Sequence, residues 1–173
     1  MKNTFKHKIK DTLSHKKFWI SNLKTLALML VIAFAITQYQ QRTMIEGLAP
    51  TLPGVNYSER STLVYFWGSW CPVCKTTSPF VSTLASENDY NIVSVALSSG
   101  SDNEIEAYLI KNNYQFKAIN DDNGDISASW GVAVTPSIYV INQAGEISHT
   151  STGMTSLWGM RLRLWLASIT LNV

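Results

Sequence analysis

Stretches of β-branched and aromatic residues alternate along the chain with segments that carry helical spacing. Each short apolar run is bounded by glycine, proline or polar residues, a pattern typical of buried strands. We expect strands at residues 61–67, 91–97, 115–119, 137–141 and 146–151. Helical patterns cover residues 70–86, 126–131 and 156–169, and a further helix is expected after Ser101. The order β-α-β-α-β-α-β-β-α predicts an α/β fold with a central mixed sheet.

Local signals refine three of these elements. Pro79 falls in the middle of the first helix, where it removes a backbone donor and is expected to kink the helix. Ser101 and Glu104 have the spacing of a capping box, which supports a helix beginning there. The acidic stretch 121–125 does not have the spacing of a calcium loop, so we expect a solvated turn.

The amino-terminal part has a different pattern. Residues 25–41 carry no charge, and within them Leu26–Ile36 is an unbroken apolar run. As a helix this stretch reaches roughly 25 Å, slightly less than the ~30 Å hydrocarbon core of a bilayer. We predict a single transmembrane anchor here, with Lys24 and Arg42 at its two ends and Trp19 and Tyr39 at the interfaces. The alternatives are a signal peptide cleaved after Ala33-Phe34-Ala35 and a buried core helix.

Charge is divided unevenly along the chain. Residues 1–42 hold eight Lys or Arg against one acid, a balance of +7, whereas residues 43–173 have a balance of −5. An acidic body argues against nucleic acid as its partner, and a basic head is typical of a segment that faces a membrane or a targeting machine. We therefore predict a basic cytoplasmic segment (1–24), an anchor (25–41), a linker (42–60) and one folded domain (61–173).

Both cysteines of the chain lie in one motif, Cys71-Pro72-Val73-Cys74, at the expected junction of a strand and a helix. One helical turn can bring the two sulfurs within bonding distance. Cys71 would lie at the amino end of the helix, where unpaired N–H groups and the helix dipole favour a thiolate. We expect Cys71 to attack a partner disulfide and the more buried Cys74 to resolve the mixed disulfide. This chemistry needs no cofactor, because the sulfurs carry the electrons.

Two other roles for the pair compete with this one. A purely structural disulfide would close a very short loop and add little stability. A metal site is the second alternative, since two thiolates can bind copper(I) without further ligands. The three histidines, His7, His15 and His149, offer no cluster that would complete a zinc site. The alternative function is therefore a copper(I)-binding or copper-delivery module that uses the same two thiols.

The segment LVYFWGSWCPVCK closely resembles the active-site segment of thioredoxins, and ISASWGVAVTP resembles the stretch that leads into their cis-proline. The distance of 65 positions between Cys71 and Pro136 indicates an inserted helix and strand near 98–119, which is typical of the TlpA-like branch. The ending STGMTSLWGMRLRLWLA, the strand NIVSVALSSG and the basic anchor together resemble the suppressor-for-copper-sensitivity protein D group of protein disulfide oxidoreductases.

This resemblance implies a thioredoxin-like fold and a membrane-anchored thiol-disulfide oxidoreductase in the periplasm, tethered to the bacterial inner membrane. It implies that Thr135-Pro136 is a cis peptide and that protein substrates dock on Trp70, Pro72, Thr135 and Pro136. Reduction of protein partners is the preferred direction, with a membrane-spanning thiol reductase as electron donor, a role for membrane lipid at the anchor and a link to copper tolerance.

The sequence departs from thioredoxins in three places. Tyr65 occupies the position of a buried aspartate that takes a proton from the resolving thiol, so water or Lys75 would have to accept it instead. The pair Pro72-Val73 replaces Gly-Pro, which affects the reduction potential. The amino-terminal hairpin common in the branch has little room in residues 43–61.

The remaining aromatic and basic residues have ordinary explanations. Lys75 is expected to be a solvated helix residue, with tuning of the thiolates as the alternative, and Tyr65 is the other candidate tuning residue. Arg161 and Arg163 are expected on the solvent side of the last helix. We expect core or groove-lining positions for Trp67, Trp130, Trp158 and Trp165.

Overall fold

The computed structural model describes residues 22–32, 34–36 and 44–169. The chain divides into two compact units, Met1–Tyr39 and Gln40–Val173. In the first unit, residues 22–32 and 34–36 are helical with exposed side chains. Among the described residues, no helix combines the length and the hydropathy that crossing a membrane requires. The rest of the predicted anchor and its flanks lies outside the described residues, including Trp19, Ala33, Tyr39 and Arg42.

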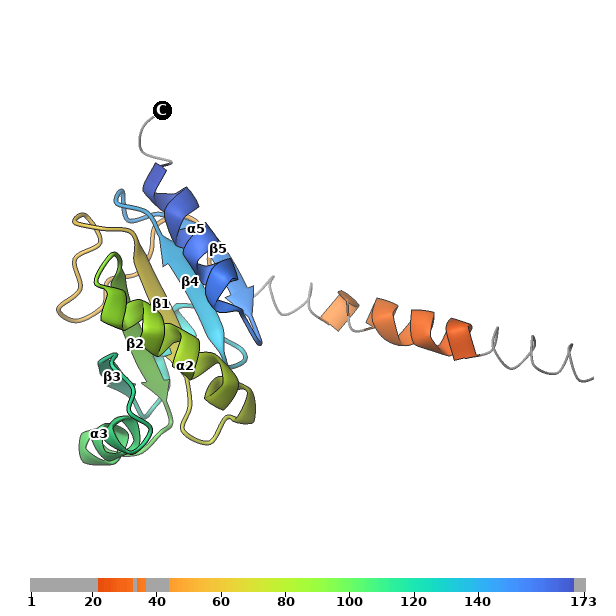
Figure 1. Cartoon of the computed structure of the whole chain (residues 1–173), viewed down its shortest axis with the longest axis horizontal. Coiled ribbons are helices and arrows are strands. Elements are labelled where there is room, and N and C mark those ends of the chain that lie inside the picture. Colours follow the sequence, from red (N-terminus) through yellow and green to blue (C-terminus); the bar gives the residue numbers. More distant parts are fainter. Residues whose placement is uncertain (1–21, 33, 37–43, 170–173) are drawn as a thin grey trace, which may run out of the picture. The chain divides into compact units, whose positions relative to one another are not determined.

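The second unit is built on a mixed five-stranded sheet in the order β3-β2-β1-β4-β5 (Figure 1). β1, β2 and β3 run parallel, β4 is antiparallel to β1, and β5 is antiparallel to β4. The strands are β1 (Thr62–Trp67), β2 (Asn91–Leu97), β3 (Ala118–Asp121), β4 (Ser137–Ile141) and β5 (Ile147–Thr152). The helices are α2 (Pro72–Glu87), α3 (Asp102–Lys111), α4 (Asp125–Ser129) and α5 (Leu157–Ile169). The predicted order of strands and helices is confirmed.

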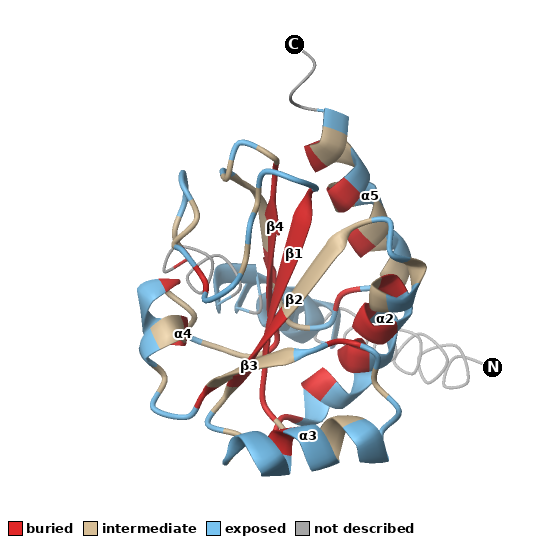
Figure 2. Cartoon of the chain, turned by 90° about the vertical axis from the view of Figure 1, so that its left-hand side faces the viewer, coloured by how far each residue is buried: buried red, intermediate tan, exposed pale blue. Residues whose placement is uncertain are grey.

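Two hydrophobic clusters cover the two faces of the sheet, and β1 is buried between them (Figure 2). In one cluster, Tyr65 and Trp67 of β1 pack with apolar residues of α2, α3 and α5. In the other, Val64 and Phe66 pack with Trp130, which follows α4. The alternation of side chains along β1 therefore divides its residues between the two cores.

The segment before β1 is packed against the domain, although the sequence predicted a linker at 42–60. Met44 and Leu52 are buried in the cluster that contains Val64 and Phe66. The Ala49 N–H donates to the Gly145 carbonyl at 2.9 Å, and the Gly47 carbonyl accepts the N–H of Ile147, the first residue of β5, at 2.7 Å. The sequence did not predict this packing, because the segment contains glycines and prolines and has no regular hydrophobic period. Its few apolar residues are nevertheless buried in the core.

The third strand begins later than predicted. Gln115 and Phe116 lie outside β3, and Phe116 is buried among the aromatic residues of the α2–α3 face. Asp121, expected in a solvated turn, is the last residue of β3 and is buried. Its carboxylate accepts the backbone N–H groups of Ile126 and Ser127 at 2.9 and 2.8 Å. It thereby satisfies donors at the start of α4 that have no partner within the helix.

The four tryptophans occupy core or groove-lining positions, as predicted. Trp67 and Trp130 are buried in the core, whereas Trp158 and Trp165 are 76% and 52% exposed and line a surface groove beside the end of α2. Arg161 forms an ion pair with Glu87 at the end of α2, and its guanidinium lies 5.1 Å from the centre of the Trp158 ring. Arg161 and Arg163, expected on the solvent side, are half-buried, and the core-facing Met160 and Leu164 lie on either side of them in the sequence.

Replacing Asp121 by alanine should lower the free energy of unfolding by about 1–3 kcal/mol, because two backbone donors at the start of α4 lose their acceptor. Urea unfolding followed by circular dichroism measures the change. Asp122→Ala is the matched control, since Asp122 is exposed, and it should change stability by less than about 0.5 kcal/mol. Equal effects of the two variants would contradict the capping role.

Buried tyrosines should make the fold sensitive to alkali. Burial raises the pKa of Tyr57 to about 12, and it also raises the pKa of Tyr65 and Tyr139. In the unfolded chain these groups ionise near pH ~10, so above that pH the unfolded state releases protons that the folded state keeps. The free energy of unfolding should thus fall as pH rises above ~10, and less steeply in Tyr65→Phe. Urea midpoints measured across this range test it; a midpoint that stays constant would contradict it.

Candidate functional site

The junction between β1 and α2 positions the two cysteines. The chain leaves β1 at Trp67 and turns through Gly68, whose carbonyl accepts the Cys71 N–H at 3.1 Å. Cys71 has extended backbone angles and is the N-cap of α2, and Pro72 is its first helical residue. Proline is suited to that place because the N–H it lacks would have no partner there. The predicted start of the helix is confirmed, and Pro79 lies inside it.

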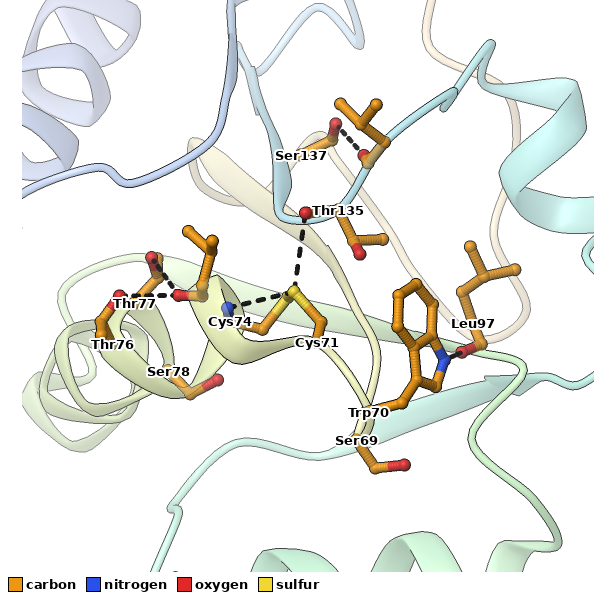
Figure 3. Close-up of a disulfide and its surroundings, with 12 residues drawn as sticks. Ser69, Trp70, Cys71, Cys74, Thr76, Thr77, Ser78, Leu97, Thr135 and Ser137 are labelled. Carbon is orange, nitrogen blue, oxygen red and sulfur yellow. Dashed lines mark hydrogen bonds between the residues drawn. A yellow bond between two sulfur atoms is a disulfide. The ribbon is translucent and has the colours of Figure 1, made fainter.

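Cys71 and Cys74 form a disulfide with their Cα atoms 5.3 Å apart (Figure 3). The backbone N–H of Cys74 donates to Cys71 Sγ at 3.1 Å. This bond and the helix dipole both stabilise negative charge on Cys71 Sγ once the disulfide is reduced. Both residues are buried, Cys71 at 3% and Cys74 at 1% exposure.

The loop before β4 lies directly against the disulfide. The Thr135–Pro136 peptide is cis, as the resemblance to thioredoxins implied. Cys71 Sγ lies 3.5 Å from the Thr135 carbonyl oxygen, to which a reduced Cys71 thiol could donate. The loop is held on both sides: Ser137 Oγ donates to the Val134 carbonyl, and the Gly153 N–H donates to the Pro136 carbonyl, each at 2.8 Å.

Of the four predicted docking residues, Thr135 and Pro136 are thus placed beside the pair. Trp70 immediately precedes Cys71 and is 57% exposed, with its indole N–H donating to the Leu97 carbonyl at 3.2 Å. Pro72 is exposed on the first turn of α2. The exposed Trp70 and Pro72 therefore flank Cys71 along the chain, and the cis-proline loop contacts its sulfur.

Tyr65 lies beneath Cys74. Its hydroxyl shares a 2.9 Å hydrogen bond with Ser78 Oγ and donates to the Cys74 carbonyl at 3.4 Å. Burial raises the Tyr65 pKa, so the phenol stays protonated near neutral pH and cannot act as a base. Sequence reasoning missed Ser78; its position four residues after Cys74 on a helix was the available signal.

Lys75 is exposed on α2, away from the buried face that carries Cys74. Within the described part of the chain, no carboxylate hydrogen-bonds to the cysteines or to Tyr65. The same residues contain no group of three or more His, Cys, Asp or Glu that could hold a metal ion. The site therefore consists of a disulfide, backbone polar groups, two hydroxyls and one exposed indole.

Comparison with known proteins agrees with this geometry. A thioredoxin-like protein of Haemophilus influenzae is 44% identical over 108 residues, which cover 62% of this chain and 64% of that protein. Sporulation thiol-disulfide oxidoreductase A of Bacillus subtilis is 26% identical over 114 residues, 63% of this chain and 67% of that protein. The chain thus spans just under two thirds of the length of the first relative and about two thirds of the second.

Solved structures share the fold. StoA of Bacillus subtilis matches with a TM-score of 0.54 and 25% identity, covering 62% of this chain and 82% of that one. A thiol:disulfide interchange protein of the thioredoxin family from Chlorobium tepidum matches with a TM-score of 0.60 and 18% identity, covering 71% and 97%. The family model described as Redoxin matches residues 52–156. The chain therefore belongs to the Redoxin family and has the thioredoxin-like fold and the cysteine pair, Cys71–Cys74, of a thiol-disulfide oxidoreductase.

Proposed function

We propose that this protein reduces disulfides of partner proteins outside the cytoplasm, with Cys71 as the attacking and Cys74 as the resolving cysteine. The observation that carries the proposal is the placement of Cys71 Sγ at the amino end of α2. There it accepts the Cys74 N–H and lies against the Thr135 carbonyl. A sulfur in that position is favoured as a thiolate, and the cis-proline loop offers backbone groups to a partner chain.

The disulfide exchange needs no cofactor, because the sulfur atoms carry both electrons. The Cys71 thiolate attacks one sulfur of the partner disulfide, and the other partner sulfur leaves as a thiolate that takes up a proton. Cys74, after losing its proton, attacks Cys71 Sγ and releases the second partner thiol. Two electrons have then passed to the partner, and the Cys71–Cys74 disulfide has formed. Because Tyr65 stays protonated and Lys75 lies on the exposed face of α2, away from Cys74, the Cys74 proton leaves to water.

We further propose that the domain is tethered to the periplasmic face of the bacterial inner membrane. The support is the uncharged stretch 25–41 together with the basic residues that precede it, which favour a cytoplasmic amino terminus. In this arrangement residues 1–24 remain in the cytoplasm, residues 25–41 contact membrane lipid, and the domain from residue 44 onward carries the chemistry. The relatives compared above come from bacteria.

Each catalytic cycle ends with a disulfide that must be reduced again. A periplasmic compartment is kept oxidising, so electrons have to come from the cytoplasmic side. We therefore propose a membrane-spanning thiol reductase as the electron donor.

Replacing Cys74 by serine should trap partners as mixed disulfides on Cys71, because the resolving thiol is lost. Non-reducing gels of the variant, expressed in a host that provides a periplasm, measure the trapped species. The double variant Cys71→Ser/Cys74→Ser is the matched control and should trap nothing. An absence of trapped species in Cys74→Ser would contradict the exchange function.

The reduction potential tests the direction of electron flow. We expect a value near that of thioredoxin, about −270 mV, which suits a reductase. Equilibration of the full chain in detergent against glutathione buffers, with the thiols counted by mass after alkylation, measures it. A value near about −120 mV would mark an oxidant and overturn the proposed direction.

A further inference from the structure

The loop between β2 and α3 is hydrogen-bonded to the turn that carries the active-site cysteine. The Ser69 N–H donates to Ser99 Oγ at 3.0 Å, and Ser99 Oγ in turn donates to the Leu97 carbonyl at 3.0 Å. The same carbonyl accepts the indole N–H of Trp70 at 3.2 Å (Figure 3). One hydroxyl therefore joins the backbone just before Trp70 to the carbonyl that holds the Trp70 ring.

The backbone around Ser99 is fixed independently of this contact. Ser98 has a φ of 43° and Gly100 a φ of 95°, and a Cβ added to Gly100 would lie 2.6 Å from Glu104 Oε2. That carboxylate accepts the Ser101 N–H at 2.8 Å, as predicted for the capping box. The Ser98 N–H donates to the Asp121 carbonyl at 3.1 Å. The loop is thus anchored to α3 and to β3, and Ser99 projects from a backbone with little freedom.

The Trp70 ring lies over the turn and faces outward. A Cβ added to Gly68 would be 2.6 Å from Trp70 Cε2, so the ring packs directly over the glycine backbone. Its N–H is already used by Leu97, yet 57% of the residue is exposed. What Trp70 offers to a partner is therefore an apolar π surface, adjacent in sequence to Cys71, with no free hydrogen-bond donor.

We propose that Ser99 is a positioning residue that holds the Trp70 ring in this orientation, and that the ring selects partner segments with an apolar or aromatic side chain beside the reacting cysteine. This inference rests on the proposed exchange function. Ser99 acts on the partner only through Trp70. It does not touch the sulfurs, so it should govern the recognition of protein segments and leave the intrinsic chemistry of the disulfide unchanged.

The test compares wild-type chain with Ser99→Ala, Ser99→Thr and the matched control Ser98→Ala. The Ser98 hydroxyl donates to the Asp122 carbonyl and does not reach the Trp70 turn. Ser98→Ala therefore removes a hydroxyl from the neighbouring residue of the same loop without removing the acceptor of the Ser69 N–H. The substrates are two disulfide-linked peptide dimers, one with leucine and phenylalanine beside the cysteine and one with serine there. Oxidised glutathione serves as a disulfide without such side chains.

Ser99→Ala should raise KM for the apolar peptide about fivefold, because the Ser69 N–H loses its acceptor and the ring loses its fixed place. Its kcat, its rate with glutathione and its reduction potential should stay at wild-type values. Ser99→Thr should restore KM, and Ser98→Ala should not change it. An unchanged KM for the apolar peptide in Ser99→Ala, or an equal rise for both peptides, would overturn the selection role.

A second measurement separates this inference from the proposed function. Acrylamide quenching of Trp70 fluorescence, obtained by difference from Trp70→Phe, should increase in Ser99→Ala but not in Ser98→Ala. If wild type exchanged disulfides no faster than Cys71→Ser, the proposed function would fail, while the quenching would still report whether Ser99 holds the ring. Unchanged quenching in Ser99→Ala would overturn the positioning role whatever the activity.

Discussion

Strand β1 is paired with β2 along one edge and with β4 along the other. Its Tyr65 and Trp67 side chains lie in one hydrophobic cluster, and its Val64 and Phe66 side chains lie in the other. A shift of one residue would move each of these side chains to the wrong core, so the register of β1 is strongly fixed. The turn at Gly68 and the N-cap at Cys71 follow within four residues of its end. The position of the Cys71 sulfur is therefore set by the packing of the strand before it.

The same arrangement separates the two cysteines chemically although both are buried. Cys71 Sγ has a backbone N–H donor and the amino end of a sixteen-residue helix, and both favour its charge. Cys74 lies one turn further, above the protonated Tyr65, whose hydroxyl is directed to Ser78 and to a carbonyl. Within the described residues no charged base hydrogen-bonds to Cys74 or Tyr65, so in the proposed exchange the loss of the Cys74 proton would depend on water reaching a buried sulfur. A phenol and a serine beneath Cys74 give a neutral site where thioredoxins place a carboxylate.

Much of this could be predicted from sequence, because the signals were local. The strands 91–97 and 137–141 have the predicted bounds. The helix start near Pro72 could be predicted because proline is favoured at the first position of a helix. The sequence predicts a strand that includes Phe116, whereas in the structure Phe116 packs in the aromatic cluster outside β3. Asp121 and Ser78 act through hydrogen bonds to residues of other elements, which strand and helix periodicity does not predict. The same holds for the exposed Trp158. Its ring packs against the guanidinium of Arg161, and Arg161 forms an ion pair with Glu87 of another helix.

The segment that contains α3 and β3 links the core to the site. Phe116 and Tyr108 of this segment pack on Trp67, the last residue of β1, with ring centres 6.0 and 5.5 Å away. The loop before α3 also brings Ser99 to the turn before Cys71. The segment thus contacts the end of β1 in the core and the following turn at the surface. An element that only extended the sheet would make neither contact, so these residues help to fix the surface around Cys71.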